Sequence, residues 1–98
     1  MGFGPVLGYN RQMSTNPKLV IRRKKSPTLE EAQGFVGGHV ELVMLNDGSQ
    51  MLLNENGMTE KLPSNRHATR IAKNSGVNMG DRGILGNVLI LRGEAKWK

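Results

Sequence analysis

The sequence predicts one small α+β domain with element order β-α-β-β-α-β, a four-stranded mainly antiparallel sheet and two helices. Three observations lead to this fold class. First, the length of 98 residues suits a single core. Second, four short apolar segments have strand character, and in two other segments apolar residues repeat with helical period. Third, Gly, Asn and Asp residues separate these segments. A ferredoxin-like layout, with the sheet buried under both helices, or a related α+β layout satisfies the order. The domain is expected at residues 17–93, between a flexible arm at 1–16 and a tail at 94–98.

The strands are predicted from β-branched and aliphatic runs bounded by turn residues. Residues 46–49, Asn-Asp-Gly-Ser, tolerate the backbone of a tight turn and therefore indicate a hairpin between the second and third strands. Gly86 and Asn87 indicate a bulge in the fourth strand. The predicted strands are residues 18–22, 39–45, 50–55 and 84–91.

The first helix has two possible starts. Either Ser26 caps it with Pro27 at the first helical position, or Thr28 and Glu31 form a capping box. Its end is expected at the pair Gly37-Gly38, because glycine readily adopts the left-handed backbone of a C-cap.

The second helix is predicted from an N-cap at Ser64 or Asn65 to about Asn74. It has a narrow apolar stripe of two alanines and one isoleucine. Positions 66, 70 and 73 are all basic and, at helical spacing, form a positive row along another face.

Composition excludes several classes of protein. The chain has no cysteine, which removes disulfides and thiol chemistry and fits a reducing compartment. The first residues lack the features of a signal peptide, and no apolar stretch is long enough to cross a bilayer. We therefore expect a soluble protein of the bacterial host cytoplasm. Met13 is an alternative start, so residues 1–12 need not be native.

Catalytic and metal-binding patterns are also missing from the sequence. His39 and His67 are the only histidines and belong to different predicted elements, so no metal site is expected. Neither a nucleophile elbow nor a phosphate-cradling Gly-Lys-Ser/Thr loop is present. Glu41 and Glu55 can approach across the predicted hairpin, but such pairs in a strand ribbon usually only hydrogen-bond across it. We expect a protein that is not an enzyme and needs no cofactor.

Four motifs resemble a known family. In chain order they are residues 35–41 (FVGGHVE), 54–57 (NENG), 62–69 (LPSNRHAT) and 86–90 (GNVLI). They are similar to segments of a family of small proteins of unknown function, encoded largely by bacteriophages, plasmids and other mobile elements. The resemblance covers about residues 28–92. It implies a mobile-element setting, in which many accessory proteins counter host immunity.

Positive charge is concentrated in two places in this chain of net charge +6. The start of the second helix combines the positive end of the helix dipole with polar and basic side chains, which suits an anionic ligand. The alternative is that Ser64 or Asn65 caps the helix while the basic row is its solvated face. The candidate ligand-binding residues are Asn65, Arg66, Thr69, Arg70, Glu41, Asn54 and Glu55. The candidate nucleic-acid-binding residues are Arg22, Arg23, Lys24, Lys25, Arg66, Arg70 and Lys73.

The leading hypothesis is a non-enzymatic phage or mobile-element protein that antagonises host antiviral defence by sequestering a cyclic nucleotide signal. In it Arg66 and Arg70 pair with phosphates, Asn65 and Thr69 orient the ligand, and the remaining residues, Glu41, Asn54 and Glu55, contact base or ribose edges. A homo-oligomer is expected, because a chain with four aromatic residues has little material for a large core. The alternative is a basic inhibitor that binds a host defence protein or nucleic acid without a small ligand. Membrane association is not expected.

Overall fold

The computed structural model describes residues 16–80 and 83–98, and within them the predicted element order is confirmed. Apart from residue 16, the predicted arm at 1–16 lies outside the described part. The elements are β1 (Leu19–Arg22), α1 (Leu29–Val36), β2 (Val40–Met44), β3 (Gln50–Asn54), α2 (Arg66–Asn74), β4 (Val88–Leu91) and the short 3-10 turn η3 (Gly93–Ala95).

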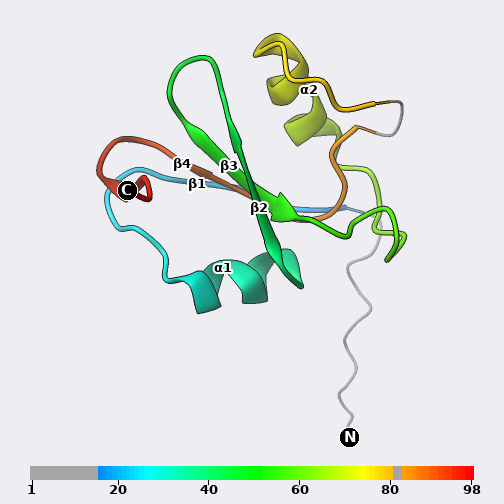
Figure 1. The fold of residues 1–98 in the computed structure, drawn as a ribbon, viewed down its shortest axis with the longest axis horizontal. Helices are drawn as coiled ribbons and strands as arrows, with labels where there is room; N and C mark the ends of the chain where they lie inside the picture. Colours follow the sequence, from blue (N-terminus) through cyan, green and yellow to red (C-terminus); the bar gives the residue numbers. More distant parts are fainter. Residues whose placement is uncertain (1–15, 81–82) are drawn as a thin grey trace, which may run out of the picture.

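The four strands form one mixed sheet in the order β1-β4-β3-β2 (Figure 1). β4 pairs parallel with β1 and antiparallel with β3, and β3 pairs antiparallel with β2. Two of the three pairings are thus antiparallel, as predicted. The central strands β3 and β4 are buried at every residue, so both faces of the sheet need a cover.

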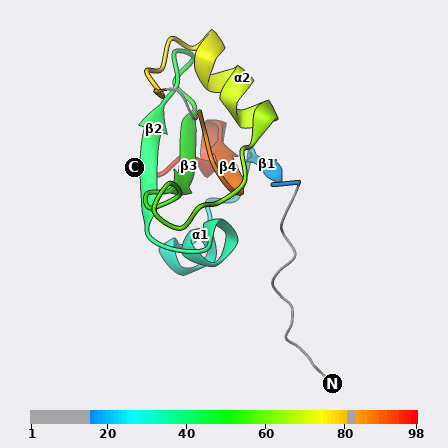
Figure 2. The ribbon, with the colours of Figure 1, turned by 90° about the vertical axis from the view of Figure 1, so that its right-hand side faces the viewer.

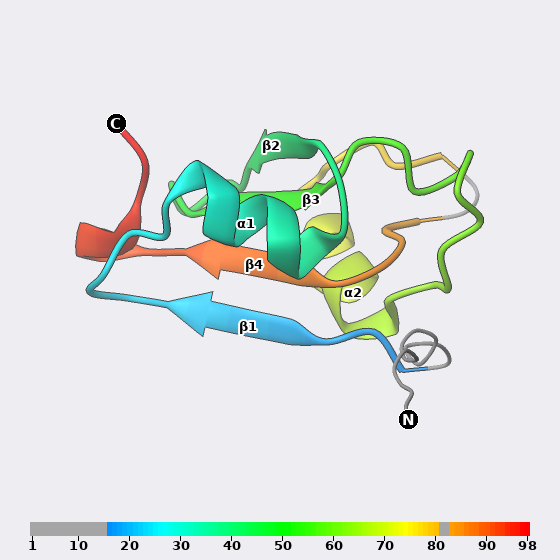
Figure 3. The ribbon, with the colours of Figure 1, turned by 90° about the horizontal axis from the view of Figure 1, so that it is seen from below.

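The two helices supply that cover from opposite faces (Figures 1 and 2). Side chains alternate along β3, so Leu52 belongs to the core beneath α1, whereas Met51 and Leu53 belong to the core beneath α2. α1 lies across β3 and β4 (Figure 3). The layout therefore differs from the ferredoxin-like one, because consecutive apolar residues in the central strands make both faces of the sheet apolar.

Helix α1 begins with the capping box. The Thr28 hydroxyl accepts from the Glu31 backbone N–H at 3.0 Å, and the Glu31 carboxylate accepts from the Thr28 N–H at 2.9 Å. Gly37 ends the helix in the left-handed conformation, with φ at 84°. Ser26 does not cap it. Its hydroxyl instead donates to the Ala95 carbonyl at 2.8 Å.

The residues predicted as a tail pack onto the domain. Ala95 is fully buried in the core under α1. The Gln50 side chain donates to the Trp97 carbonyl and accepts from the Trp97 N–H, both at 2.7 Å. The Trp97 indole N–H donates to the Pro27 carbonyl at 2.8 Å. The compact domain thus extends to residue 97, beyond the predicted boundary.

The fourth strand begins later than predicted, at Val88. Gly86 has φ at 82°, which interrupts the extended backbone where a bulge was expected. The segment before it pairs with residues ahead of α2 through a bridge between Ser64 and Leu85. This pairing fixes the position of the α2 N-terminus relative to the sheet.

Candidate functional site

Asn65 has a structural position at the start of α2. It is 2% exposed, and its Oδ1 accepts from the Ala68 N–H at 3.0 Å as the helix N-cap. Its Nδ2 donates to the carbonyls of Lys18 at 3.2 Å and Gly86 at 2.9 Å. The side chain thus joins α2 to the segments leading into β1 and β4, and its polar atoms are already used within the protein.

Thr69 is likewise engaged by the backbone around it. Its hydroxyl donates to the Asn65 carbonyl at 2.8 Å and accepts from the Ile84 N–H at 2.9 Å. A methyl group added at Gly83 would lie 2.8 Å from that hydroxyl. Thr69 therefore attaches the segment around residue 84 to α2, and its hydroxyl already donates and accepts a hydrogen bond within the protein.

The basic row of α2 lines one hollow, which we call the basic depression. Arg66, Arg70 and Lys73 border it and are exposed. Its volume is about 670 Å³, and it is open to solvent. Side chains at i, i+4 and i+7 lie on one face of a helix, which explains why the three cations share this surface. The complete lining is Ser64, Arg66, Thr69, Arg70, Lys73 and Asn74.

The second basic segment lies elsewhere in the fold. Residues 22–25 form the end of β1 and the exposed start of the loop to α1. Arg22 borders a depression together with Glu31 and Phe35 of α1. α1 and α2 cover opposite faces of the sheet, so Arg22 and the basic depression do not form one continuous groove.

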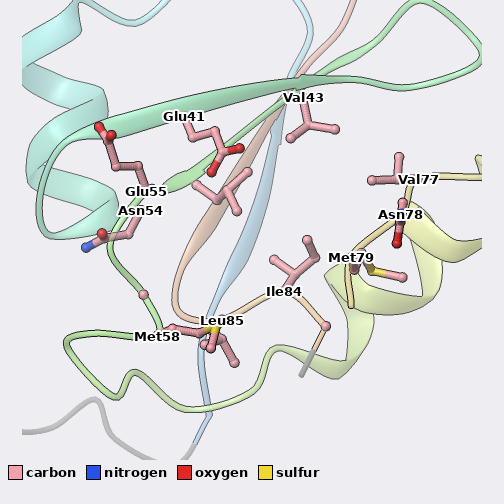
Figure 4. Close-up of a pocket in the computed structure, with 13 residues that line it drawn as sticks. Glu41, Val43, Asn54, Glu55, Met58, Val77, Asn78, Met79, Ile84 and Leu85 are labelled. Carbon is pink, nitrogen blue, oxygen red and sulfur yellow. The ribbon is translucent and has the colours of Figure 1, made fainter. Parts of the chain in front are cut away.

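Asn54 and Glu55 are not directed toward the basic depression. Asn54 is 3% exposed, and its Nδ2 donates to the Val36 carbonyl at 3.2 Å and the Glu60 carboxylate at 3.1 Å. Its Oδ1 accepts from the Asn56 N–H at 2.7 Å. The Glu55 carboxylate is exposed and points away from the neighbouring cleft (Figure 4). Asn54 therefore supports the turn after β3.

That cleft, which we call the apolar cleft, lies between β2, β3 and the two segments around residues 77–79 and 83–85. Its volume is about 220 Å³. The Glu41 carboxylate is directed toward its centre from edge strand β2 (Figure 4). The apolar side chains that line it are Val43, Leu53, Met58, Val77, Met79, Ile84 and Leu85.

Glu41 was predicted as a site residue from the sequence, whereas the apolar lining of this cleft was not. These residues come from five separate segments, and only the folded chain places them together. The one sequence signal was the excess of methionines, six in 98 residues, of which Met58 is 60% exposed beside the cleft. An exposed methionine at a cleft edge is typical of adaptable binding surfaces.

The predicted site residues do not all line one cavity. Arg66, Arg70 and Lys73 come together, Glu41 faces a different cavity, and the buried asparagines 65 and 54 hold the backbone. In the described ranges, 16–80 and 83–98, no group of three His, Asp or Glu side chains has the proximity to hold a metal ion. Nor does any helix of the described part have the length and apolar character to span a membrane.

Cations are arranged to neutralise phosphate or carboxylate, and a separate apolar cavity is arranged to enclose a small hydrophobic group. The basic depression lies along α2, and the apolar cleft is lined in part by residues 77–79 and 83–85, which follow α2 in the chain.

Comparison with known proteins gives one match. Searches of curated proteins and of solved structures found no similar chain. A family model described as a domain of unknown function, DUF3846, matches residues 12–97, which include every element of the fold and both cavities. The chain therefore belongs to the DUF3846 family.

Proposed function

We propose that this protein is a non-enzymatic binding protein for a phosphate-bearing ligand, which it holds in the basic depression. The observation that carries the proposal is the shared position of Arg66, Arg70 and Lys73 around one hollow at α2. Guanidinium groups form paired, charge-assisted hydrogen bonds with phosphate oxygens. The N-terminal end of α2 adds the positive end of its dipole.

The ligand we propose most concretely is a cyclic nucleotide that serves as an immune signal. The four motifs that resemble proteins of phages and other mobile elements support this setting. In it the protein acts in the cytoplasm of the bacterial host and sequesters the signal, so that the antiviral defence is not activated. In this function Arg66 and Arg70 bind the phosphates. Asn65 and Thr69 support the site, because their polar atoms already form hydrogen bonds within the protein.

Isothermal titration calorimetry tests this function. The probes are a panel of cyclic dinucleotides, cyclic trinucleotides and cyclic ADP-ribose isomers. Each lost charge-assisted hydrogen bond costs about 1.5–3 kcal/mol, so Arg66→Ala and Arg70→Ala should each weaken binding by about tenfold to a hundredfold. Lys24→Ala removes the same charge from the exposed loop before α1 and is the matched control. The function is excluded when no probe binds and Arg66→Ala also leaves anti-defence activity in infected cells intact.

The second candidate is a nucleic-acid or host-protein ligand bound through the charged surface. The basic run Arg22-Arg23-Lys24-Lys25 favours it, because its last three side chains are exposed and clustered cations contact phosphates without a cavity. Fluorescence anisotropy with a labelled oligonucleotide at increasing salt separates the two. With double-stranded DNA as the labelled probe, each phosphate contact removed by mutation in the run should lower the slope of log K against log salt concentration by about 0.9. If the anisotropy change does not decrease with salt, or if substitutions in the run leave it unchanged, nucleic-acid binding through this run is ruled out.

A further inference from the structure

The apolar cleft has a shape and chemistry different from those of the basic depression, although the two are neighbours. Gly83 and Ile84 line the cleft, while Thr69 lines the depression, and the Thr69 hydroxyl accepts from the Ile84 N–H at 2.9 Å. The backbone at residues 83–84 therefore separates them. A ligand that places phosphates in one cavity thus has the other beside it for its remaining parts.

We propose that the apolar cleft binds the base of the nucleotide ligand and selects guanine through Glu41. This inference rests on the proposed function, because it requires that the ligand be a nucleotide. Beyond that function, the bound base is guanine and the side chain that selects it is Glu41.

The walls of the cleft suit a flat ring. Met58 and Met79 are on its lining, and thioether sulfurs make favourable contacts with aromatic rings. Val43, Leu53 and Ile84 supply aliphatic surface. Ligand pockets combine such apolar walls with a small number of polar groups that fix orientation. The volume of about 220 Å³ accommodates one small planar group.

The polar side chains on the lining are Glu41, Asn54, Glu55 and Asn78, and the Glu41 carboxylate is directed toward the centre of the cleft (Figure 4). An ionised carboxylate accepts hydrogen bonds and donates none. Guanine presents two adjacent donors, N1–H and the N2 amino group, which match the two carboxylate oxygens. Adenine and cytosine present one amino donor beside a ring-nitrogen acceptor, and uracil has one N–H between two carbonyls. Guanine is therefore the base whose edge satisfies both oxygens without opposing lone pairs.

The other predicted base-reading residues do not share this role. Asn54 hydrogen-bonds Val36, Asn56 and Glu60 within the protein. The Glu55 carboxylate is directed away from the cleft centre (Figure 4). Base selectivity in this structure consequently depends on Glu41. Glu55 borders the same cleft from the turn after β3 but directs its carboxylate away from the centre, so it offers a matched control with the same side chain (Figure 4).

The test is calorimetry with guanosine, inosine and adenosine 5′-monophosphates. Wild-type protein should bind the guanosine nucleotide about ten to a hundred times more tightly than the adenosine nucleotide, since a charged pair of hydrogen bonds is lost. The inosine nucleotide lacks the N2 amino group and should lie between them. Glu41→Gln should abolish the preference, because its amide presents one donor and one acceptor, whereas Glu55→Gln should retain it. Both positions are exposed, so the variants should fold.

The possible outcomes distinguish a failure of guanine selection from a failure of phosphate binding. Equal binding of the three nucleotides, lost in Arg70→Ala but unchanged in Glu41→Gln, overturns guanine selection and leaves phosphate binding intact. A guanine preference that depends on Glu41 but not on Arg66 or Arg70 supports the cleft and overturns the phosphate site. Absence of binding by guanosine mono- and cyclic dinucleotides overturns guanine selection whatever other ligand is found.

Discussion

The two faces of the sheet are covered by helices of similar length but different side chains. α1 buries Ala32 and Val36 and packs Phe35 against its core, and the docked Trp97 extends the cover. α2 buries only the two alanines Ala68 and Ala72, with Ile71 partly buried. Small side chains bring a helix close to a sheet but cover little of it. The segments after α2 complete that layer, and the apolar cleft remains between them and β2.

This difference explains where binding surfaces arise. On the α1 side, Phe35 and Trp97 pack against the core and Gln50 attaches the C-terminal residues, while a shallow depression remains beside Glu31 and Phe35. On the α2 side the narrow apolar stripe leaves most of the helix surface polar, and there the basic row is located. The face with the smaller apolar stripe thus carries both candidate cavities.

The largest expected effects come from the central strand. Met51 and Leu52 are neighbours on β3 and fully buried, one in the core of each face. Met51→Ala and Leu52→Ala should each lower the free energy of unfolding by about 2–5 kcal/mol, since each creates a cavity. Urea denaturation followed by circular dichroism measures this. A nearly neutral result for either would show that its face holds no true core.

The next effect concerns the start of α2. Asn65→Ala removes an N-cap and leaves the buried Gly86 carbonyl and the part-buried Lys18 carbonyl without this donor, so it should cost about 3 kcal/mol of unfolding free energy. Asn65→Asp keeps the cap acceptor but faces the same carbonyls, so it should also destabilise. Ser64→Ala, at an exposed neighbour, is the control. If Asn65→Ala unfolds at the wild-type urea concentration, the structural role given to Asn65 is wrong.

A smaller effect is expected at the start of α1. Thr28 caps this helix but is exposed and has no role in joining strands. Thr28→Ala should therefore cost about 1 kcal/mol, the usual value of an N-cap. Thr28→Ser keeps the hydroxyl and should restore most of the loss. The same urea experiment applies, and a cost equal to that of Asn65→Ala would remove the contrast between the two helix starts.

The smallest effect is a pH dependence at the hairpin between β2 and β3. The Ser49 N–H donates to the Asp47 carboxylate at 2.9 Å, and this bond holds the pKa of Asp47 below its ordinary value. A lowered pKa stabilises the fold at pH values above the ordinary Asp range, and the contribution is lost as pH falls through the folded-state pKa. Asp47→Ala should melt slightly lower at neutral pH, and the difference in Tm should shrink in acid. Thermal melts at several pH values decide this, and a gap that widens in acid contradicts it.

Local sequence alone determined most of the secondary structure. The capping pair Thr28 and Glu31, the glycine at position 37 and the turn at 46–49 act within a few residues, so their effects do not require knowledge of the fold. The positive row of α2 also follows from helical spacing alone. For this reason Arg66, Arg70 and Lys73 were correctly predicted to share a face.

Tertiary structure decided which face each helix covers and what each polar residue does. The consecutive apolar residues of β3 and β4 show that both faces of these strands are apolar but not which helix lies on which. The polar side chain of Asn65 and its place at a helix start led to its prediction as a ligand-binding residue. In the fold it instead hydrogen-bonds the Lys18 carbonyl, 47 positions away in the sequence. The apolar cleft likewise gathers side chains from five segments, because burial of surface depends on proximity in space, which local sequence does not specify.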